Sequence, residues 1–294
     1  MIIRKTVSEH NKRNKLYHAN DLWLNGQKKL ARIRFDKARR PDGTIDVSQL
    51  PKLYGSNPKL EKSNDGSGHL TTGQSFAPSW VSGYNMCSFA SGCSKICLNH
   101  SGHGQKHMMN GENHFVTQAR LMRTWFYKEF PAQYREQVTK EMKSHIRKAK
   151  KLEAFPAHRP NNLSDELWEK IWPELFDMFP EVLFYDYTAV PNRNIDHIPN
   201  YHLVFSRKED NEDLAFSQTK YNISACFAVK KGDPLPKEYK GKRVVDGDMH
   251  DMIWKWKEAY PNEQVVIGLR PKGQAAWLDT SGFVIPTNAD GVVF

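Results

Sequence analysis

The amino-acid sequence predicts an α/β protein with a partial or complete βα barrel. From residue 153 onward, short runs rich in β-branched and aromatic residues alternate with helical runs, which gives roughly six strand–helix units. Strands joined in this way pair in parallel through right-handed crossovers. Polar residues follow the ends of successive predicted strands, and a cysteine-rich loop precedes the first unit. The polar residues suit a barrel, because barrel enzymes collect their functional groups where strands end.

The chain is long enough, at 294 residues with 39% hydrophobic content, to bury a substantial core. No apolar run reaches membrane-spanning length, and the first 15 residues lack the apolar stretch of a signal peptide. We therefore expect no membrane contact and a cytoplasmic location. The expected organisation is a basic N-terminal segment over residues 1–40 and a single α/β domain over residues 41–294.

Most of the net charge lies in residues 1–40. This segment holds twelve Lys or Arg against three acidic residues, so it carries +9 of the net +10. Such a segment can bind nucleic acid by neutralising phosphates, or it can be a solvated extension. Apolar residues predict that the segment is partly folded, and they are Leu22, Trp23, Leu24, Leu30, Ile33 and Phe35.

Residues 41–78 are expected to be mostly loop, because Gly and Pro interrupt any long periodicity there. Within and just after this stretch, residues 56–60 and 71–80 are predicted to form turns and short extended pieces. The clearest helix starts near Glu112 and carries apolar residues at every third or fourth position. Pro131 breaks or restarts it, and a second amphipathic helix follows.

The later strands are followed by polar side chains that are candidates for catalysis. These candidates are Arg159, Asp165, Asp186, Arg207 and Asp248. Ordinary structural roles compete with this interpretation, since an aspartate at such a position often caps a helix or opens a turn. A group of nearby carboxylates also suits magnesium and a hydrolytic reaction, and here it would consist of Asp246, Asp248 and Asp251.

The loop over residues 85–114 holds three of the four cysteines and four of the twelve histidines. Cys87, Cys93 and Cys97 follow the pattern C-x5-C-x3-C among small residues, which let the loop curl until three sulfurs face one point. Thiolates select zinc, copper(I) or iron–sulfur clusters. A disulfide framework and buried inert thiols are the competing interpretations, although four cysteines are few for such a framework.

Two kinds of metal site fit this loop. A zinc ion needs four ligands, and His100, His103 or His107 could complete a Cys3His set. A cubane iron–sulfur cluster would use the three cysteines and leave one iron open to a small molecule, to water or to Cys226.

Cys226 lies in the predicted strand ISACFAV. Alternation places it on the face opposite Ile223, Ala225 and Phe227, so it faces the barrel interior if those three residues face helices. It is either a small buried thiol or a fourth cluster ligand.

The order of several motifs resembles the phage-encoded gene product eighty-eight family. The motifs span roughly residues 55–285 and comprise SNPKL, TGQSFAPSW, the cysteine loop, HRPNNLSDELWE, FPEVLFYDYT, FSRKEDNE and VVDGDMHD. The resemblance implies a viral or prophage origin and a location in the cytoplasm of a bacterial host. It implies no particular activity.

A more distant similarity is to radical SAM enzymes, in which a three-cysteine loop before a βα barrel holds a four-iron cluster with one open iron. Here the spacing is C-x5-C-x3-C in place of C-x3-C-x2-C. The similarity implies a [4Fe–4S] cluster on Cys87, Cys93 and Cys97, with S-adenosylmethionine as a further ligand.

Three functions follow as hypotheses. The first is a phage-encoded iron–sulfur enzyme of the radical-SAM-like or another redox type, with an unknown small-molecule substrate. The second is a non-catalytic, nucleic-acid-associated phage protein in which a structural zinc ion or cluster staples the cysteine loop. The third is a magnesium-dependent hydrolase.

Overall fold

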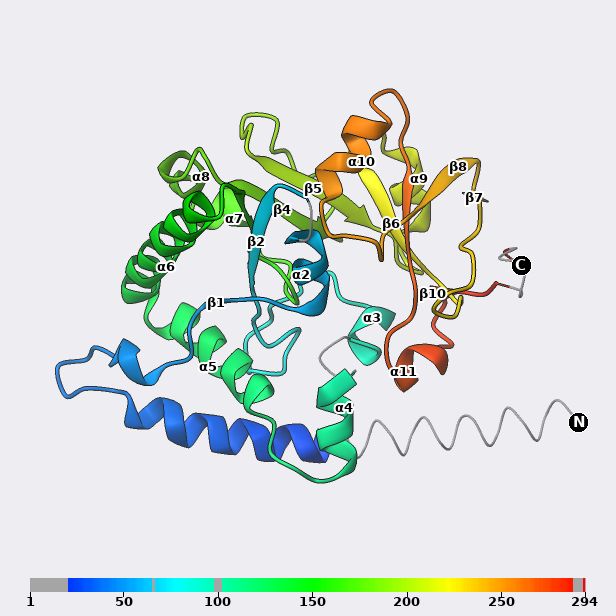
Figure 1. Cartoon of the computed structure of the whole chain (residues 1–294). Helices are drawn as coiled ribbons and strands as arrows, with labels where there is room; N and C mark the ends of the chain where they lie inside the picture. The colour runs from blue at the N-terminus through cyan, green and yellow to red at the C-terminus, as the bar shows by residue number, and fades with distance from the viewer. Residues whose placement is uncertain (1–20, 65–66, 98–101, 288–292, 294) are drawn as a thin grey trace, which may run out of the picture.

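A mostly parallel β-sheet organises the molecule (Figure 1). The computed structural model describes residues 21–64, 67–97, 102–287 and 293. Within these residues the strand order is β1-β2-β3-β4-β5-β6-β9-β8-β7, and β10 pairs with β6. The edge strands β1 and β7 pair in antiparallel fashion, whereas all other pairs are parallel. The α/β class is therefore confirmed, but the sheet stays open and a complete barrel is wrong.

Six strands after residue 153 fall where the sequence predicted them, namely β3, β4, β5, β6, β8 and β9, whereas the short strands β7 and β10 were not predicted. The strands are β1 (Tyr54–Gly55), β2 (His69–Gln74), β3 (Phe155–Arg159), β4 (Leu183–Thr188), β5 (Tyr201–Ser206), β6 (Asn222–Phe227), β7 (Glu238–Tyr239), β8 (Lys242–Asp246), β9 (Val266–Leu269) and β10 (Val284–Ile285). The helices are α2 (Pro58–Asn64), α3 (Gly92–Lys95), α4 (Gly102–Met109), α5 (Phe115–Glu129), α6 (Pro131–Lys151), α7 (Trp168–Ile171), α8 (Glu174–Met178), α9 (Glu212–Ser217), α10 (Ile253–Ala259) and α11 (Gln274–Trp277).

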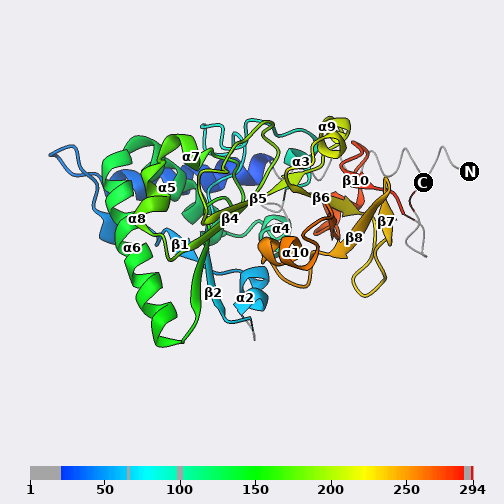
Figure 2. The same ribbon diagram turned by 90° about the horizontal axis from the view of Figure 1, so that it is seen from above.

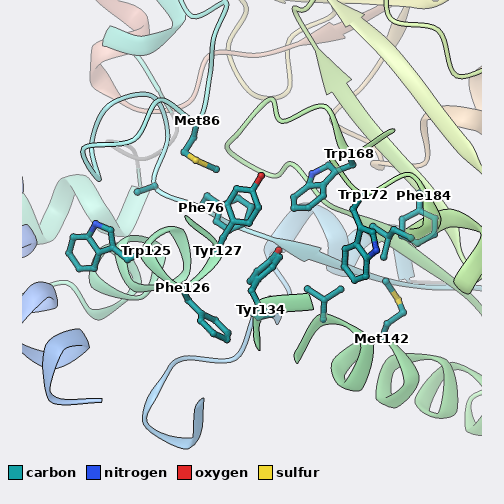
Figure 3. Close-up of a cluster of buried hydrophobic side chains, with 14 of the residues drawn as sticks. Phe76, Met86, Trp125, Phe126, Tyr127, Tyr134, Met142, Trp168, Trp172 and Phe184 are labelled. Carbon is teal, nitrogen blue, oxygen red and sulfur yellow. The ribbon is translucent and has the colours of Figure 1, made fainter. Parts of the chain in front are cut away.

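Helices cover the two faces of the sheet. In Figure 2, α5 and α7 lie on one side of β4 and β5, and α2 and α10 lie on the other. The α5–α7 side, the outer face, is packed by large aromatic residues that include Phe76, Tyr127, Tyr134 and Trp168 (Figure 3). Two of these residues come from the predicted amphipathic helices, which Pro131 separates by starting α6 at its first position.

The opposite side, the inner face, carries a second buried cluster. Alternate strand residues such as Tyr185, Val204 and Ile267 pack there against Leu60 of α2 and Trp254 of α10. Because α2 lies between β1 and β2 and α10 follows β8, the inner face is completed by segments from distant parts of the chain.

The basic N-terminal segment is helical over residues 21–37, where Ala31 and Phe35 are fully buried in the main core. In Figure 1 this helix, in dark blue, runs along α5. Arg32 and Arg39 both form ion pairs with Glu129 of α5. Part of the positive charge of this segment is therefore neutralised by the body of the protein.

Two elements within the predicted loop region were missed by sequence reasoning. Strand β2 is the first parallel strand of the sheet, and its threonines and glycine looked like a turn. Helix α2 begins at Pro58, and the side chain of Asn57 accepts hydrogen bonds from the backbone N–H groups of Lys59 and Leu60. An asparagine cap followed by proline at the first helical position was the available signal.

Candidate functional site

A cavity of about 340 Å³ lies at the carboxyl ends of the parallel strands. Inner-face side chains from β3 to β6 line it, namely Arg159, Tyr187, Ser206, Ser224 and Cys226. Arg159, Tyr187 and Ser206 each lie two residues after an inner-face core residue of the same strand, so alternation turns them to that face. Ser224 pairs with Ser206 on the neighbouring strand, and Cys226 lies two residues after Ser224. A cavity of this size at this edge of an open α/β sheet is a usual location for a small-molecule site.

The cysteine loop connects β2 to the helical layer and places all three of its thiols on the cavity wall. Burial raises the pKa of Cys87 to about 12, and the nearby Cys97 and Cys93 contribute to this shift. Burial also raises the pKa of Cys93. None of the four cysteines, all of which are described, forms a disulfide, so a disulfide framework does not hold the loop.

Loops after two different strands hold the cysteine loop in place. On the β3 side, the backbone N–H of Asp165 donates to the carbonyl of Met86 at 2.8 Å. On the β5 side, the carboxylate of Glu209 accepts a hydrogen bond from the backbone N–H of Gly92 at 2.6 Å. A Cβ atom at position 92 would collide with the hydroxyl of Ser281, so this contact requires glycine. These contacts fix the loop against the cavity wall.

The histidines proposed as zinc ligands do not complete a site in the described part of the chain. His107 pairs with Glu112 at 2.9 Å and stacks on His114, whereas His100 and the side chain of His103 lie outside what the structure describes. Across all described residues, no group of three or more His, Cys, Asp or Glu is arranged to hold a metal ion.

Four of the five candidate catalytic residues share the cavity with the three cysteines. They are Arg159, Asp165, Arg207 and Asp248. Cys226 also lines this cavity, while Ile223, Ala225 and Phe227 pack in an apolar cluster on the other face, as alternation predicted.

Asp186 is not among the lining residues, because alternation turns it to the outer face. Its carboxylate is fully buried and accepts hydrogen bonds of 2.8 Å from the backbone and side chain of Asn161 and from the hydroxyl of Tyr201. Burial raises the pKa of Asp186 to about 7, although Arg159 and Arg193 oppose the shift. The structure therefore gives Asp186 a place in a buried polar network that joins β4, β5 and the β3–α7 loop.

The three aspartates near β8 all form ion pairs, and Asp251 pairs with different cations from Asp246 and Asp248. Arg270 contacts both Asp246, at 2.9 Å, and Asp248. Asp251 instead binds Lys59 and Arg159 at 2.8 and 2.9 Å. Each carboxylate is thus neutralised by the chain itself, which removes the geometric basis for a shared magnesium site.

Lys59 is the lining residue that sequence reasoning missed most clearly. It lies on α2, a helix that was expected to be a turn, and only 17% of its side chain is exposed. Its Nζ atom donates to the hydroxyl of Tyr187 at 3.3 Å. The lysine therefore belongs to the cavity wall.

These features define a class of protein: an open, mostly parallel α/β protein with a cavity at its strand ends that a three-cysteine loop helps to line. The model of the Gene product 88 family matches residues 51–287, and the chain belongs to this family of phage gene products. No curated protein and no solved structure matches the chain. Among the described residues, no helix is both long enough and apolar enough to cross a membrane.

Proposed function

We propose that this protein is a phage-encoded iron–sulfur enzyme, with a [4Fe–4S] cluster on Cys87, Cys93 and Cys97 and an unknown small-molecule substrate. The observation that carries the proposal is the common cavity: the three thiols of one loop line the same cavity as Arg159, Asp165, Arg207 and Asp248. A structural cluster would not need a lined cavity of about 340 Å³ beside it.

The donor set fits a cluster better than a single zinc ion. A cluster binds each thiolate through a different iron, so its three cysteines stay farther apart than the ligands of one ion. The three thiols lie near one another, because Cys97 and Cys93 both act on the pKa of Cys87. The raised pKa of Cys87 means that ligation of any metal must displace its proton.

When bound, such a cluster supplies electron transfer and one iron that can take an exogenous ligand. The chain places Cys226 and the strand-end side chains around the remaining space. In radical SAM enzymes, which the chain distantly resembles, a three-cysteine loop precedes the βα units. The loop here precedes β3 and the units that follow it, and S-adenosylmethionine is the first ligand to test. The cytoplasm of the bacterial host, which keeps thiols reduced, is the compartment that suits these cysteines.

Anaerobically prepared protein is expected to be brown and to contain iron and sulfide in near-equal amounts. Chemical analysis of iron, sulfide and zinc checks this expectation. Colourless protein with one zinc per chain would contradict it. Electron paramagnetic resonance of the reduced cluster, with and without S-adenosylmethionine, then tests the open iron. A shifted signal supports an enzyme, whereas an unchanged signal in a cluster that survives air supports a structural role.

The uneven charge of the sequence favours a second function, in which the protein binds nucleic acid through its basic N-terminal segment. Arg32 and Arg39 are paired with Glu129 in the fold, so the phosphate contacts would come from cations such as Lys12, Arg13 and Lys15, which lie outside the described residues. The cluster and the cavity use no residue of this segment. Mutations in the segment can therefore test nucleic-acid binding without changing the proposed enzyme site.

Changing Lys12, Arg13 and Lys15 together to Gln is expected to weaken binding to double-stranded DNA. The slope of log K against log salt should become shallower by about 2–3, because each lost phosphate contact removes roughly 0.9 from it. The control changes three exposed lysines of α6 to Gln, namely Lys143, Lys150 and Lys151. Equal slopes for the two triple variants, measured by fluorescence anisotropy, would rule out this segment as the nucleic-acid site.

A further inference from the structure

The cavity wall is rich in cations. Its charged lining residues include only two carboxylates, Asp165 and Asp248, against six cations, namely Lys59, Arg159, Arg207, Lys208, Arg270 and Lys272. Four of these cations have a carboxylate partner of their own: Arg207 pairs with Glu212, Lys208 with Asp210, Arg270 with Asp246 and Lys272 with Asp248. The other two cations, Lys59 and Arg159, lie next to each other and pair with the same carboxylate.

Lys59 and Arg159 share a single carboxylate. Asp251 binds Lys59 through one oxygen at 2.8 Å and Arg159 through the other at 2.9 Å. Its side chain is only 1% exposed, and burial alone would raise its pKa, but Arg159 and Lys59 lower the pKa to about 2. Lys59 and Arg159 thus share one ionised carboxylate in a region shielded from water, where charge interactions are strengthened.

This pair of cations also keeps hydrogen-bond donors available. The Nε–H of Arg159 is buried and has no hydrogen-bond partner among the described residues. Lys59 uses two of its three N–H groups, on Asp251 and on the hydroxyl of Tyr187. A buried donor without a partner costs free energy, and an anion in the cavity would remove that cost through charge-assisted hydrogen bonds.

Tyr187 holds the two cations in position. Its ring lies 5.1 Å from the Lys59 ammonium and 4.6 Å from the Arg159 guanidinium, both within cation–π distance. The donors are therefore fixed before a ligand arrives, which lowers the ordering cost of binding.

The apolar residues of the cavity lining indicate the chemistry of the rest of the ligand. Apolar side chains from several segments border the same space, including Leu163, Leu269 and Phe283. An inorganic ion would leave these side chains without a partner. An organic molecule with one anionic group would use both parts of the cavity.

We propose that Lys59, Arg159 and Asp251 form an anion-binding subsite that holds the phosphate or carboxylate group of an organic substrate. This subsite deepens the proposed function, because it names the substrate class of the same cavity. Its residues belong to α2, β3 and the β8–α10 loop and not to the cysteine loop, so the subsite exists in protein without iron.

Calorimetry on the metal-free, full-length protein tests the subsite. The probes are glycerol 3-phosphate, succinate and inorganic phosphate, with glycerol as the neutral control. Binding of glycerol 3-phosphate or of succinate supports the subsite and identifies the anionic group, whereas glycerol should not bind. If neither organic anion binds at concentrations up to about 10 mM, or if glycerol binds as well as they do, the subsite is overturned.

Lys59→Met isolates the contribution of the subsite. Asp251 keeps Arg159 as its partner in this variant, so the carboxylate stays neutralised. Affinity for the bound anion should fall roughly 10- to 100-fold, as expected for a lost charge-assisted hydrogen bond. Lys62→Met, on the exposed side of the same helix, is the matched control and should bind as the wild type does. Equal affinities of the two variants would overturn the assignment.

Circular dichroism shows whether Lys59→Met folds. If it does not, chemical footprinting of the wild-type protein tests the subsite instead. The wild-type protein is acetylated with and without a saturating amount of the bound anion, and modification of each lysine is followed by mass spectrometry. Acetylation of Lys59 should slow when the anion is present, while acetylation of Lys62 should not change. Unchanged acetylation of Lys59 would overturn the subsite. Because iron plays no part in these measurements, they stand or fall independently of the cluster.

Discussion

Single changes of Cys87, Cys93 or Cys97 to Ala are expected to reduce the iron content of anaerobically prepared protein to background and to abolish its colour. Each thiol would hold a different iron, so a cubane without one of them is left with two protein ligands. Iron and sulfide analysis, together with the visible absorption spectrum, measures the effect. A variant in this set that keeps full iron and colour would show that its cysteine is not a ligand.

Cys226→Ala is the matched control, because this thiol lines the same cavity from β6. Retained iron and colour in this variant would identify Cys226 as a cavity residue that the cluster does not need. Loss of the cluster in all four variants would make Cys226 the fourth ligand and close the open iron. Circular dichroism of the metal-free variants separates loss of ligation from loss of folding.

Asp186→Asn is expected to lower the free energy of unfolding by about 2–4 kcal/mol. The wild-type carboxylate accepts three hydrogen bonds of 2.8 Å from Asn161 and Tyr201. An amide replaces one of its acceptor oxygens with a donor, so at least one buried donor loses its partner. Urea denaturation of the metal-free protein measures the change.

The pH dependence of this deficit follows from the raised pKa of Asp186. In the unfolded chain the group ionises near the usual value of about 3.9, whereas in the folded protein burial raises its pKa to about 7. Its contribution to stability is therefore complete below about pH 4 and is lost as pH rises toward 7. The deficit of Asp186→Asn should thus be largest at acid pH. A deficit that grows from pH 5 to pH 7.5 would mean that Arg159 and Arg193 stabilise the ionised form.

The sequence predicted the second half of the fold well, because its strands and helices carry strong periodic patterns. The first parallel strand was missed, since the residues of β2 resemble a turn and its partner β3 lies about 85 residues later in the chain. Side-chain alternation alone was enough to place Cys226 in the cavity. The same rule applied to Asp186 would have excluded it, because it lies one residue from the inner-face Tyr185.

The subsite could not be predicted from local patterns. Lys59 and Asp251 are far apart in sequence, and each looks like an ordinary surface residue when only its neighbours are considered. Their pairing depends on how an open sheet brings α2 and the β8–α10 loop to one face. Only the assembled structure supplies that information.

The junction of α2 with the β8–α10 loop also determines when the cavity can exist during synthesis. The hydrogen bond from the backbone N–H of Asp251 to the hydroxyl of Ser63 joins residues 188 positions apart, and the Lys59 ion pair crosses the same interval. Contacts between such distant residues form late, after the intervening parallel strands have paired. A nascent chain that still lacks its last third therefore displays the cysteine loop without the wall opposite to it. Binding at the subsite must therefore wait until Asp251 has been synthesised and its loop has packed against α2.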